Sequence, residues 1–205
     1  MDRIERLDLD RTAVMLCDMQ NGFLHPKGSY ARGGAASPNF APAIVALKSV
    51  TDAMRAKGGW IAGSMFTLIS DRQGEPFIAE HLKKLRPFLQ RGDFAPGSFD
   101  QAIMDDFQPV HLPVEKVAYS AFYMSRLDFA LQKAGITTLL MGGVVTNGGV
   151  ASTVRDAHTR GYHAIVLEDG CAAFRTEVHK ATIADLSNLT TVMSCADAVK
   201  LIQAS

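Results

Sequence analysis

The sequence lacks a net charge and any long hydrophobic run. Its 21 lysine and arginine residues balance 21 aspartate and glutamate residues, so no broad electrostatic field favours nucleic acid or an anionic membrane as a partner. No apolar run approaches the roughly 18 residues that span a bilayer, and the amino-terminal segment is charged and lacks the apolar stretch of a signal peptide. We therefore expect a cytoplasmic protein that acts on a small molecule, with neither nucleic acid nor a membrane as partner.

Cysteine and histidine are too scattered to suggest disulfide bonds or a metal site. The three cysteines, Cys17, Cys171 and Cys195, have an odd count and no Cys-x-x-Cys spacing, which argues against a disulfide framework and a structural zinc site. The six histidines are dispersed along the chain, a pattern more typical of surface and loop residues than of metal ligands. We predict no catalytic metal and no cofactor.

Short apolar segments alternate with helical patterns along most of the chain. The apolar segments predict strands at 12–17, 60–66, 114–119, 137–144, 163–167 and 190–193. Helical spacing predicts helices from Pro42 to Gly58-Gly59 and at 77–85, 99–107, 125–133, 176–187 and 196–202, with another that ends at Gly161. The segment up to residue 39 is rich in glycine and proline and predicts a long loop. This alternation indicates an α/β fold, with helices on both faces of a parallel sheet, in a single domain spanning residues 1–205.

A glycine-rich stretch joins the predicted strand at 137–144 to the following helix. Strand-to-helix turns form binding sites because the first helical turn has free backbone N–H groups at the positive end of the helix dipole. The N–H groups of Val145, Gly148 and Gly149 are therefore candidate donors to an anion or a developing oxyanion. The alternative is that the glycines only allow the chain to turn and pack closely.

Two charged residues belong to predicted strands that end at the same edge of the sheet. Asp18 directly follows the strand at 12–17, and Lys116 lies within the strand at 114–119. An unpaired ammonium is costly to bury, so Lys116 needs a partner unless its side chain extends outward to solvent. Asp18 is a candidate partner, although a carboxylate at a strand end also commonly accepts hydrogen bonds from a loop. Because ligands bind beyond the carboxyl ends of parallel strands, we group both residues with the glycine-rich turn.

Three motifs follow one another along the chain. They are Asp18-Met19-Gln20-Asn21-Gly22-Phe23, then Lys116 with Tyr119-Ser120-Ala121-Phe122, then Gly143-Val144-Val145-Thr146 leading to Ser152-Thr153-Val154-Arg155-Asp156-Ala157. Together they closely resemble the isochorismatase-like hydrolases, also called the cysteine hydrolase superfamily, from Arg11 to about Val199. The resemblance implies a Rossmann-like, three-layer α/β/α fold with a six-stranded parallel sheet, a homodimer or homotetramer, and a site of Asp, Lys and Cys. It also implies a non-proline cis peptide bond between Val144 and Val145.

The chain departs from this family at one position of the site. In amidase members a nucleophilic cysteine begins the helix, and the matching residue here is Gly149, which cannot attack a substrate. The isochorismatases also have glycine there, and they cleave a vinyl ether by protonation and addition of water. Resemblance to that branch implies that Asp18 is the acid and that Lys116 positions Asp18 or holds a substrate carboxylate. It places a second carboxylate on the amides of Gly148 and Gly149.

Other residues are predicted to line the pocket or to cover it. The pocket candidates are Phe23, Phe66, Phe122, Thr146 and Asn147. Ordinary core packing is the alternative for the three phenylalanines. Arg86 and Arg91 could meet an anionic substrate, but exposed surface is the favoured prediction for both. The metal-dependent nicotinamidase members have an Asp-x-His pair after the second strand, and residues 66–72 contain no histidine.

The sequence thus predicts a hydrolase that lacks the cysteine nucleophile and acts on a small anionic substrate. Vinyl-ether hydrolysis of an isochorismate-like compound is the specific version of this prediction. One alternative is a non-catalytic member that binds a metabolite or partner through the same pocket. Another is an amidase that uses a different thiol, for which Cys171 is the candidate because Cys17 points away from its neighbour Asp18. The alternative role for Cys171 is a small buried thiol near a turn.

Overall fold

The computed structural model describes residues 4–205 and is built on a six-stranded sheet in the order β3-β2-β1-β4-β5-β6. Every pairing between neighbouring strands is parallel. The strands are β1 (Thr12–Cys17), β2 (Trp60–Phe66), β3 (Leu112–Lys116), β4 (Thr138–Val144), β5 (His163–Ala172) and β6 (Thr191–Met193). The predicted α/β fold with a parallel sheet is confirmed.

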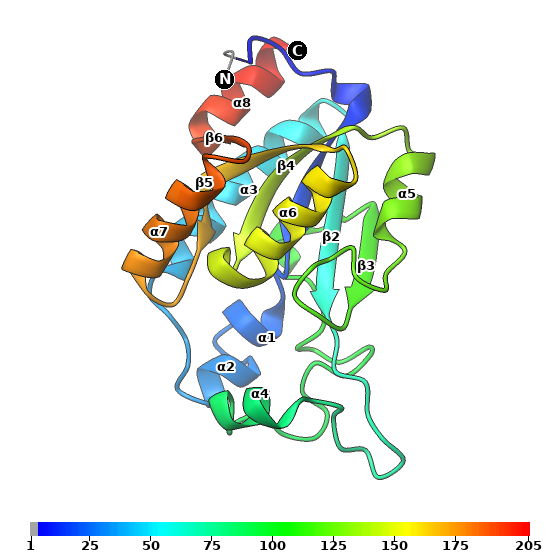
Figure 1. Ribbon diagram of the computed structural model, residues 1–205, viewed down its shortest axis with the longest axis vertical. Coiled ribbons are helices and arrows are strands. Elements are labelled where there is room, and N and C mark those ends of the chain that lie inside the picture. Colours follow the sequence, from blue (N-terminus) through cyan, green and yellow to red (C-terminus); the bar gives the residue numbers. More distant parts are fainter. Residues whose placement is uncertain (1–3) are drawn as a thin grey trace.

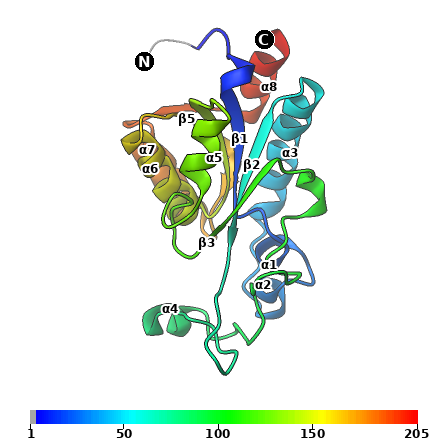
Figure 2. The same ribbon diagram turned by 90° about the vertical axis from the view of Figure 1, so that its right-hand side faces the viewer.

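Helices cover both faces of the sheet and give the molecule three layers (Figures 1 and 2). One face carries α3 (Phe40–Ala56) and α8 (Cys195–Ala204), and the other carries α5 (Leu127–Lys133), α6 (Ala151–Thr159) and α7 (Thr176–Leu186). The short helices α1 (Asn21–Leu24), α2 (Ser29–Arg32) and α4 (Glu80–Leu85) lie beyond the carboxyl ends of the strands, at the bottom of Figure 1. Further helical turns are Leu9–Arg11, Asp105–Phe107 and a π-helical turn at Thr146–Val150, which leads into α6.

Strand β1 is buried along its whole length because its alternate side chains enter two separate cores. Val14 and Leu16 belong to the core that contains Leu47 of α3. Met15 belongs to the core on the opposite face, which contains Val154 of α6. This burial on both faces explains why the strand reads as a continuous apolar run rather than as an alternating one.

The strand order places β1 at the point where the chain changes direction across the sheet. From β1 the chain builds β2 and β3 on one side, and it then returns to build β4, β5 and β6 on the other. The crevice between the carboxyl ends of β1 and β4 is the usual binding position in such sheets. Asp18 follows β1, and the glycine-rich turn follows β4.

Two predictions between β2 and β4 are wrong. Strand β3 spans Leu112–Lys116 and not 114–119, because the chain turns after Lys116 and brings the carbonyls of Ala118 and Tyr119 to its ammonium group. Residues 99–107 do not form one helix, because Ile103 makes an isolated antiparallel bridge with Gln20. Ile103, Met104 and Phe107 pack into the core from this largely irregular segment.

Two other segments are more ordered than predicted. Strand β5 continues to Ala172, five residues beyond the predicted end at Leu167, and its pairing with β4 shifts register between Met141 and Gly143. The exposed pair Glu168-Asp169 lies at this irregularity, which is why the sequence suggested a strand end. The predicted loop before residue 39 contains the one-turn helices α1 and α2.

Candidate active site

Asp18 lies directly beyond β1 in a conformation that fixes its carboxylate. Its φ of 54° is in the left-handed region, which is unfavourable for a residue with a Cβ atom and needs support from its surroundings. Ser64 of β2 provides part of that support. Its hydroxyl donates to Oδ1 of Asp18 at 2.7 Å and accepts from the Asp18 N–H at 3.3 Å.

Lys116 is the partner of this carboxylate. Its Nζ atom lies 2.7 Å from Oδ2 of Asp18, and the two side chains are only 2% and 7% exposed, respectively. The ammonium also donates to the carbonyls of Ala118 at 3.0 Å and Tyr119 at 2.9 Å. These three acceptors match the three protons of the lysine. The predicted approach of Asp18 and Lys116 is therefore present in the structure.

Gly149 faces this ion pair from the turn that follows β4. A Cβ atom on Gly149 would stand 3.1 Å from Oδ2 of Asp18 and 3.3 Å from Nζ of Lys116. The peptide bond between Val144 and Val145 is cis, at the position that the resemblance implies. The N–H of Gly148 donates to the Val145 carbonyl at 2.9 Å, so this predicted anion donor is engaged within the turn.

The charge state of Asp18 is set by two opposing effects. Burial raises the pKa of Asp18 above its usual range, and the neighbouring Lys116 lowers it by a smaller amount. The hydrogen bond from Ser64 also favours the charged form. The net rise in pKa brings this carboxyl closer to the range in which a proton donor works near neutral pH.

These residues lie at one end of a cavity of about 250 Å³. Its walls are mainly apolar and come from α1, α2, β2, the segment at 78–89, the loop after β3 and the turn after β4. The lining residues are Asp18, Phe23, Tyr30, Phe66, Ile78, Leu82, Arg86, Leu89, Lys116, Val117, Ala118, Tyr119, Val144, Val145 and Gly149. An apolar cavity with a few convergent polar groups is typical of a small-molecule site.

Sequence comparison agrees with this geometry. A model of the isochorismatase domain matches residues 12–198, which is most of the chain. The chain belongs to the isochorismatase family.

Relatives of this isochorismatase-family protein include two named amidohydrolases. Ureidoacrylate amidohydrolase RutB of Methylobacterium radiotolerans is 31% identical over 192 residues, covering 88% of this chain and 74% of that protein. RutB of Caulobacter vibrioides is 33% identical over 177 residues, covering 80% of this chain and 77% of that protein. Together with the family match, these relatives identify the chain as a hydrolase.

Solved structures share its fold. A cysteine hydrolase from Pseudomonas syringae pv. phaseolicola 1448A has a TM-score of 0.82 at 22% identity, with 98% of this chain and 96% of that chain covered. N-carbamoylsarcosine amidase from Thermoplasma acidophilum has a TM-score of 0.70 at 24% identity, with 90% of this chain and 96% of that chain covered. The predicted isochorismatase-like hydrolase fold is confirmed.

Three predicted pocket residues of this family member lie outside the cavity. The side chain of Thr146 is buried against α7, where its hydroxyl lies 2.9 Å from Nδ1 of His179. Asn147 is exposed on the turn. Phe122 is buried in the core, and its ring stacks on Tyr162 at a centroid distance of 5.6 Å. Of the five predicted pocket candidates, Phe23 and Phe66 line the cavity.

The thiol considered as a substitute nucleophile is also remote from the cavity. Cys171 is buried in β5, where its thiol faces the Met141 carbonyl at 3.8 Å. Burial raises the pKa of the Cys171 thiol to about 12, so the nucleophilic thiolate is rare at neutral pH. Cys171 is not among the residues that line the cavity. Its surroundings fit the alternative role of a small buried thiol.

Three residues of the cavity wall, Tyr30, Arg86 and Tyr119, were not predicted from the sequence as pocket residues. Arg86 follows α4, and its Nε–H donates to the hydroxyl of Tyr30 at 2.7 Å. Tyr119 lines the same wall. Arg86 is thus part of the cavity, and the favoured prediction of exposed surface is wrong for it. For Arg91 that prediction is confirmed, because this residue is exposed and pairs with Glu75 at 2.9 Å.

The described chain shows neither a metal-binding cluster nor a membrane-spanning helix. Within residues 4–205, no group of three or more His, Cys, Asp or Glu residues is arranged to hold a metal ion. In the same range no helix is long and apolar enough to cross a bilayer.

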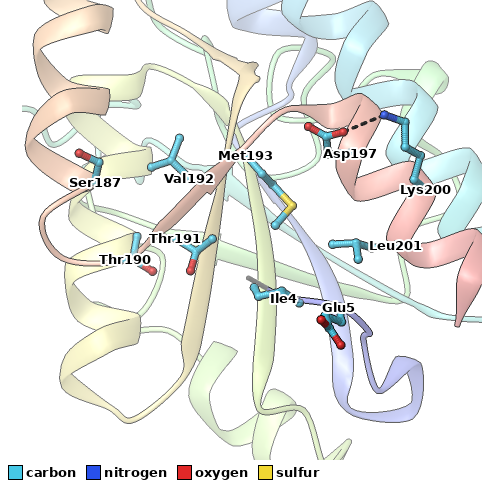
Figure 3. A pocket seen from close by; sticks show the side chains of 10 residues that line it. All are labelled: Ile4, Glu5, Ser187, Thr190, Thr191, Val192, Met193, Asp197, Lys200 and Leu201. Atoms are coloured by element: carbon cyan, nitrogen blue, oxygen red, sulfur yellow. Dashed lines mark hydrogen bonds and ion pairs between the residues drawn. The ribbon is translucent and has the colours of Figure 1, made fainter. Parts of the chain in front are cut away.

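A larger and more open hollow of about 750 Å³ lies beside the edge strand β6 (Figure 3). Residues of β6 and α8 line it together with Ile4 and Glu5. Its charged side chains include Asp197 and Lys200 of α8, which form an ion pair at 2.9 Å. Both charges already have a protein partner, whereas Asp18, Lys116 and Gly149 all line the smaller cavity.

Proposed function

We propose that this isochorismatase-family hydrolase acts on a small anionic substrate without a side-chain nucleophile. One observation carries the proposal: a Cβ atom on Gly149 would lie 3.1 Å from Oδ2 of Asp18 and 3.3 Å from Nζ of Lys116, so glycine at this position leaves the space beside the ion pair without a side chain. A substrate or water molecule that contacts Gly149 from the cavity can therefore approach both groups. Proton transfer through Asp18 is therefore available where other family members place a thiol.

Vinyl-ether hydrolysis of an isochorismate-like compound fits this arrangement. Asp18 gives its proton to the terminal carbon of the enol ether, and positive charge develops on the carbon that is bonded to the ether oxygen. Water adds to that carbon, the resulting hemiketal loses the alcohol, and pyruvate is released. The proton lost by water restores Asp18, so the net reaction consumes one water molecule.

The environment of Asp18 supports the role of an acid. Burial raises the pKa of Asp18 even though Lys116 acts in the opposite direction. Once Asp18 has given up its proton, the ammonium of Lys116 at 2.7 Å stabilises the carboxylate that forms. Lys116 thus serves as the electrostatic partner of the reaction rather than as a proton donor.

Amide hydrolysis is the second candidate, favoured by the names of the amidohydrolase relatives. Without a thiol at position 149, this reaction would require water as the nucleophile and Asp18 as a base. Val145 and Gly149 line the cavity, and their N–H groups are the candidate donors to the oxyanion. A version that uses Cys171 is disfavoured by its burial and by its raised pKa of about 12.

A substrate panel distinguishes these reactions. Purified protein is incubated with isochorismate, with ureidoacrylate and with simple amides and esters, and pyruvate, ammonia and acid are measured. We expect pyruvate from isochorismate, and we expect Asp18→Asn to abolish its release. Ammonia without pyruvate would favour the amidase reaction. Tight ligand binding with no turnover of any compound would instead indicate a non-catalytic member of the family.

A further inference from the structure

Arg86 brings a positive charge into the cavity that no protein carboxylate balances. The charged residues of the cavity wall are Asp18, Lys116 and Arg86. Asp18 and Lys116 neutralise one another in the ion pair at 2.7 Å. No aspartate or glutamate among residues 4–205 lies within ion-pair distance of Arg86. The cavity therefore has one positive charge in excess.

Two other arginines of the segments beyond the carboxyl ends of the strands are neutralised. Arg32 of α2 pairs with Asp93 at 2.5 Å, and Arg91 pairs with Glu75 at 2.9 Å. Arg86 is half-buried, so leaving its charge unpaired has an energetic cost that a solvated arginine would not have. Such a cost is expected where a charge is kept for a ligand.

A tyrosine holds the Arg86 guanidinium without cancelling its charge. The Nε–H of Arg86 donates to the Tyr30 hydroxyl at 2.7 Å, and Tyr119 lines the same cavity. Burial raises the pKa of Tyr30 above its usual value, so the phenol stays neutral near neutral pH. A guanidinium has five N–H donors in a rigid fork, which leaves donors for a carboxylate in the cavity.

The geometry points to Arg86 as the residue that anchors the substrate, and to a carboxylate with an apolar body as the substrate class. The carboxylate accepts two hydrogen bonds from the guanidinium. The body packs against Phe23, Phe66 and Leu82, which line the wall of this 250 Å³ cavity. The reacting group then reaches Asp18. This assignment of the reacting end rests on the proposed function, whereas recognition by Arg86 can be tested without turnover.

Calorimetric titration of the full chain with benzoate and benzyl alcohol tests the anchor. The two probes have the same ring, but only benzoate carries a carboxylate. We expect the unmodified protein to bind benzoate about tenfold to a hundredfold more tightly than benzyl alcohol. Arg86→Gln should lose this preference while still binding benzyl alcohol. The matched control Arg91→Gln removes an exposed, paired arginine and should leave the preference unchanged.

Several results would overturn the assignment. Equal benzoate binding by Arg86→Gln and by the unmodified protein refutes it. Lack of a preference for benzoate in the unmodified protein, or lack of benzoate binding at millimolar concentration, also refutes it. Arg86→Lys provides a second variant in case Arg86→Gln fails to fold, as judged by circular dichroism. Lysine keeps the charge but loses the planar fork, so several-fold weaker benzoate binding is expected and equal binding refutes the bidentate contact.

The binding result is separable from the substrate panel. Turnover of a substrate, without preferential binding of benzoate over benzyl alcohol, would support the proposed function and reject Arg86 as the anchor. Arg86-dependent benzoate binding without turnover of any substrate would reject the proposed function and support the anchor. When a turned-over carboxylate is found, Arg86→Gln should raise KM by a larger factor than it lowers kcat, because the anchor contacts ground state and transition state alike.

Discussion

Oδ2 of Asp18 and Nζ of Lys116 lie 2.7 Å apart in a site that excludes solvent from both side chains. The carboxylate comes from the centre of the sheet and the ammonium from its edge strand β3, so the pair spans the end of β2. Because neither charge is solvated, the ammonium of Lys116 strongly favours the charged form of Asp18. We expect the proposed proton transfer and the stability of the protein both to depend on this contact.

The rate should depend on pH through Asp18. Burial raises the pKa of this carboxyl, and an acid is active only while it holds its proton. We therefore expect kcat/KM for the vinyl-ether substrate to fall as pH rises through the pKa of Asp18. Asp18→Asn should lower the rate by about 10²- to 10⁴-fold and remove this dependence. A rate that rises with pH over the same range would assign Asp18 the role of a base.

Lys116→Met should make the stability of the protein pH-dependent. Removing one partner of a buried ion pair costs about 3–5 kcal/mol, because the other charge stays buried and unpaired. Asp18 can relieve this cost by taking up a proton. Loss of Lys116 raises its already raised pKa further, so the folded state binds the proton more tightly than the unfolded state.

This difference in proton binding makes the unfolding free energy of Lys116→Met decrease as pH rises. Stability is retained below the unfolded carboxyl pKa of about 3.9 and is lost as pH rises through the folded value. Urea unfolding of Lys116→Met at acidic and alkaline pH measures the effect. Lys48→Met, which removes an exposed pair with Asp52, is the matched control and should change stability by less than about 1 kcal/mol. Equal losses of unfolding free energy in Lys116→Met and Lys48→Met would contradict the burial of the ion pair between Lys116 and Asp18.

Thr146 is expected to hold the turn rather than to bind substrate. Its hydroxyl lies 2.9 Å from Nδ1 of His179 and links the π-helical turn to α7. Thr146→Val keeps the shape and removes the hydrogen bond, at a cost of about 0.5–1.5 kcal/mol in unfolding free energy. Benzoate affinity should not change. A large loss of benzoate binding with unchanged stability would place Thr146 in the binding site after all.

His179 gives this contact a pH dependence. Burial lowers the pKa of His179, and Glu168 opposes the shift. The unfolded state therefore takes up a proton first, and the unfolding free energy should fall as pH decreases below the ordinary histidine pKa of about 6.5. His179→Gln should reduce this decrease in thermal melts between neutral and mildly acidic pH. If the unfolding free energy of His179→Gln falls with pH as much as that of the unmodified protein, groups other than His179 cause the decrease.

The sequence was most informative where burial on both faces left a continuous apolar pattern. Strands β1 and β2 have the predicted bounds. The cost of burying Lys116 made Asp18 its candidate partner, and the structure shows this pair rather than the alternative of an outward-reaching lysine. Both inferences depend on local composition and on the edge at which parallel strands end. The same edge argument added the glycine-rich turn as the third part of the candidate site.

The parts of the cavity wall that lie outside the strands could not be predicted in the same way. Arg86 lies in an irregular segment between β2 and β3, where its contact with Tyr30 joins residues 56 positions apart. Thr146 was misplaced because a π-helical turn rotates side chains differently from a regular helix start. The helical spacing at 99–107 arose from an irregular segment whose residues Ile103 and Phe107 reach the core. Tertiary contacts decide such positions.

Gly149→Cys tests whether this turn still has the geometry of a thiol site. The new Cβ would stand 3.1 Å from Oδ2 of Asp18 and 3.3 Å from Nζ of Lys116, so the ammonium should favour the thiolate. We expect iodoacetamide to modify this thiol much faster than the three buried native cysteines, and we expect amide hydrolysis to appear. Gly149→Ala adds the same Cβ without sulfur and should gain neither property. Both variants should lose vinyl-ether activity, because the added Cβ narrows the space beside the ion pair through which the substrate is proposed to reach Asp18. Retention of full activity in Gly149→Ala would contradict that route of approach.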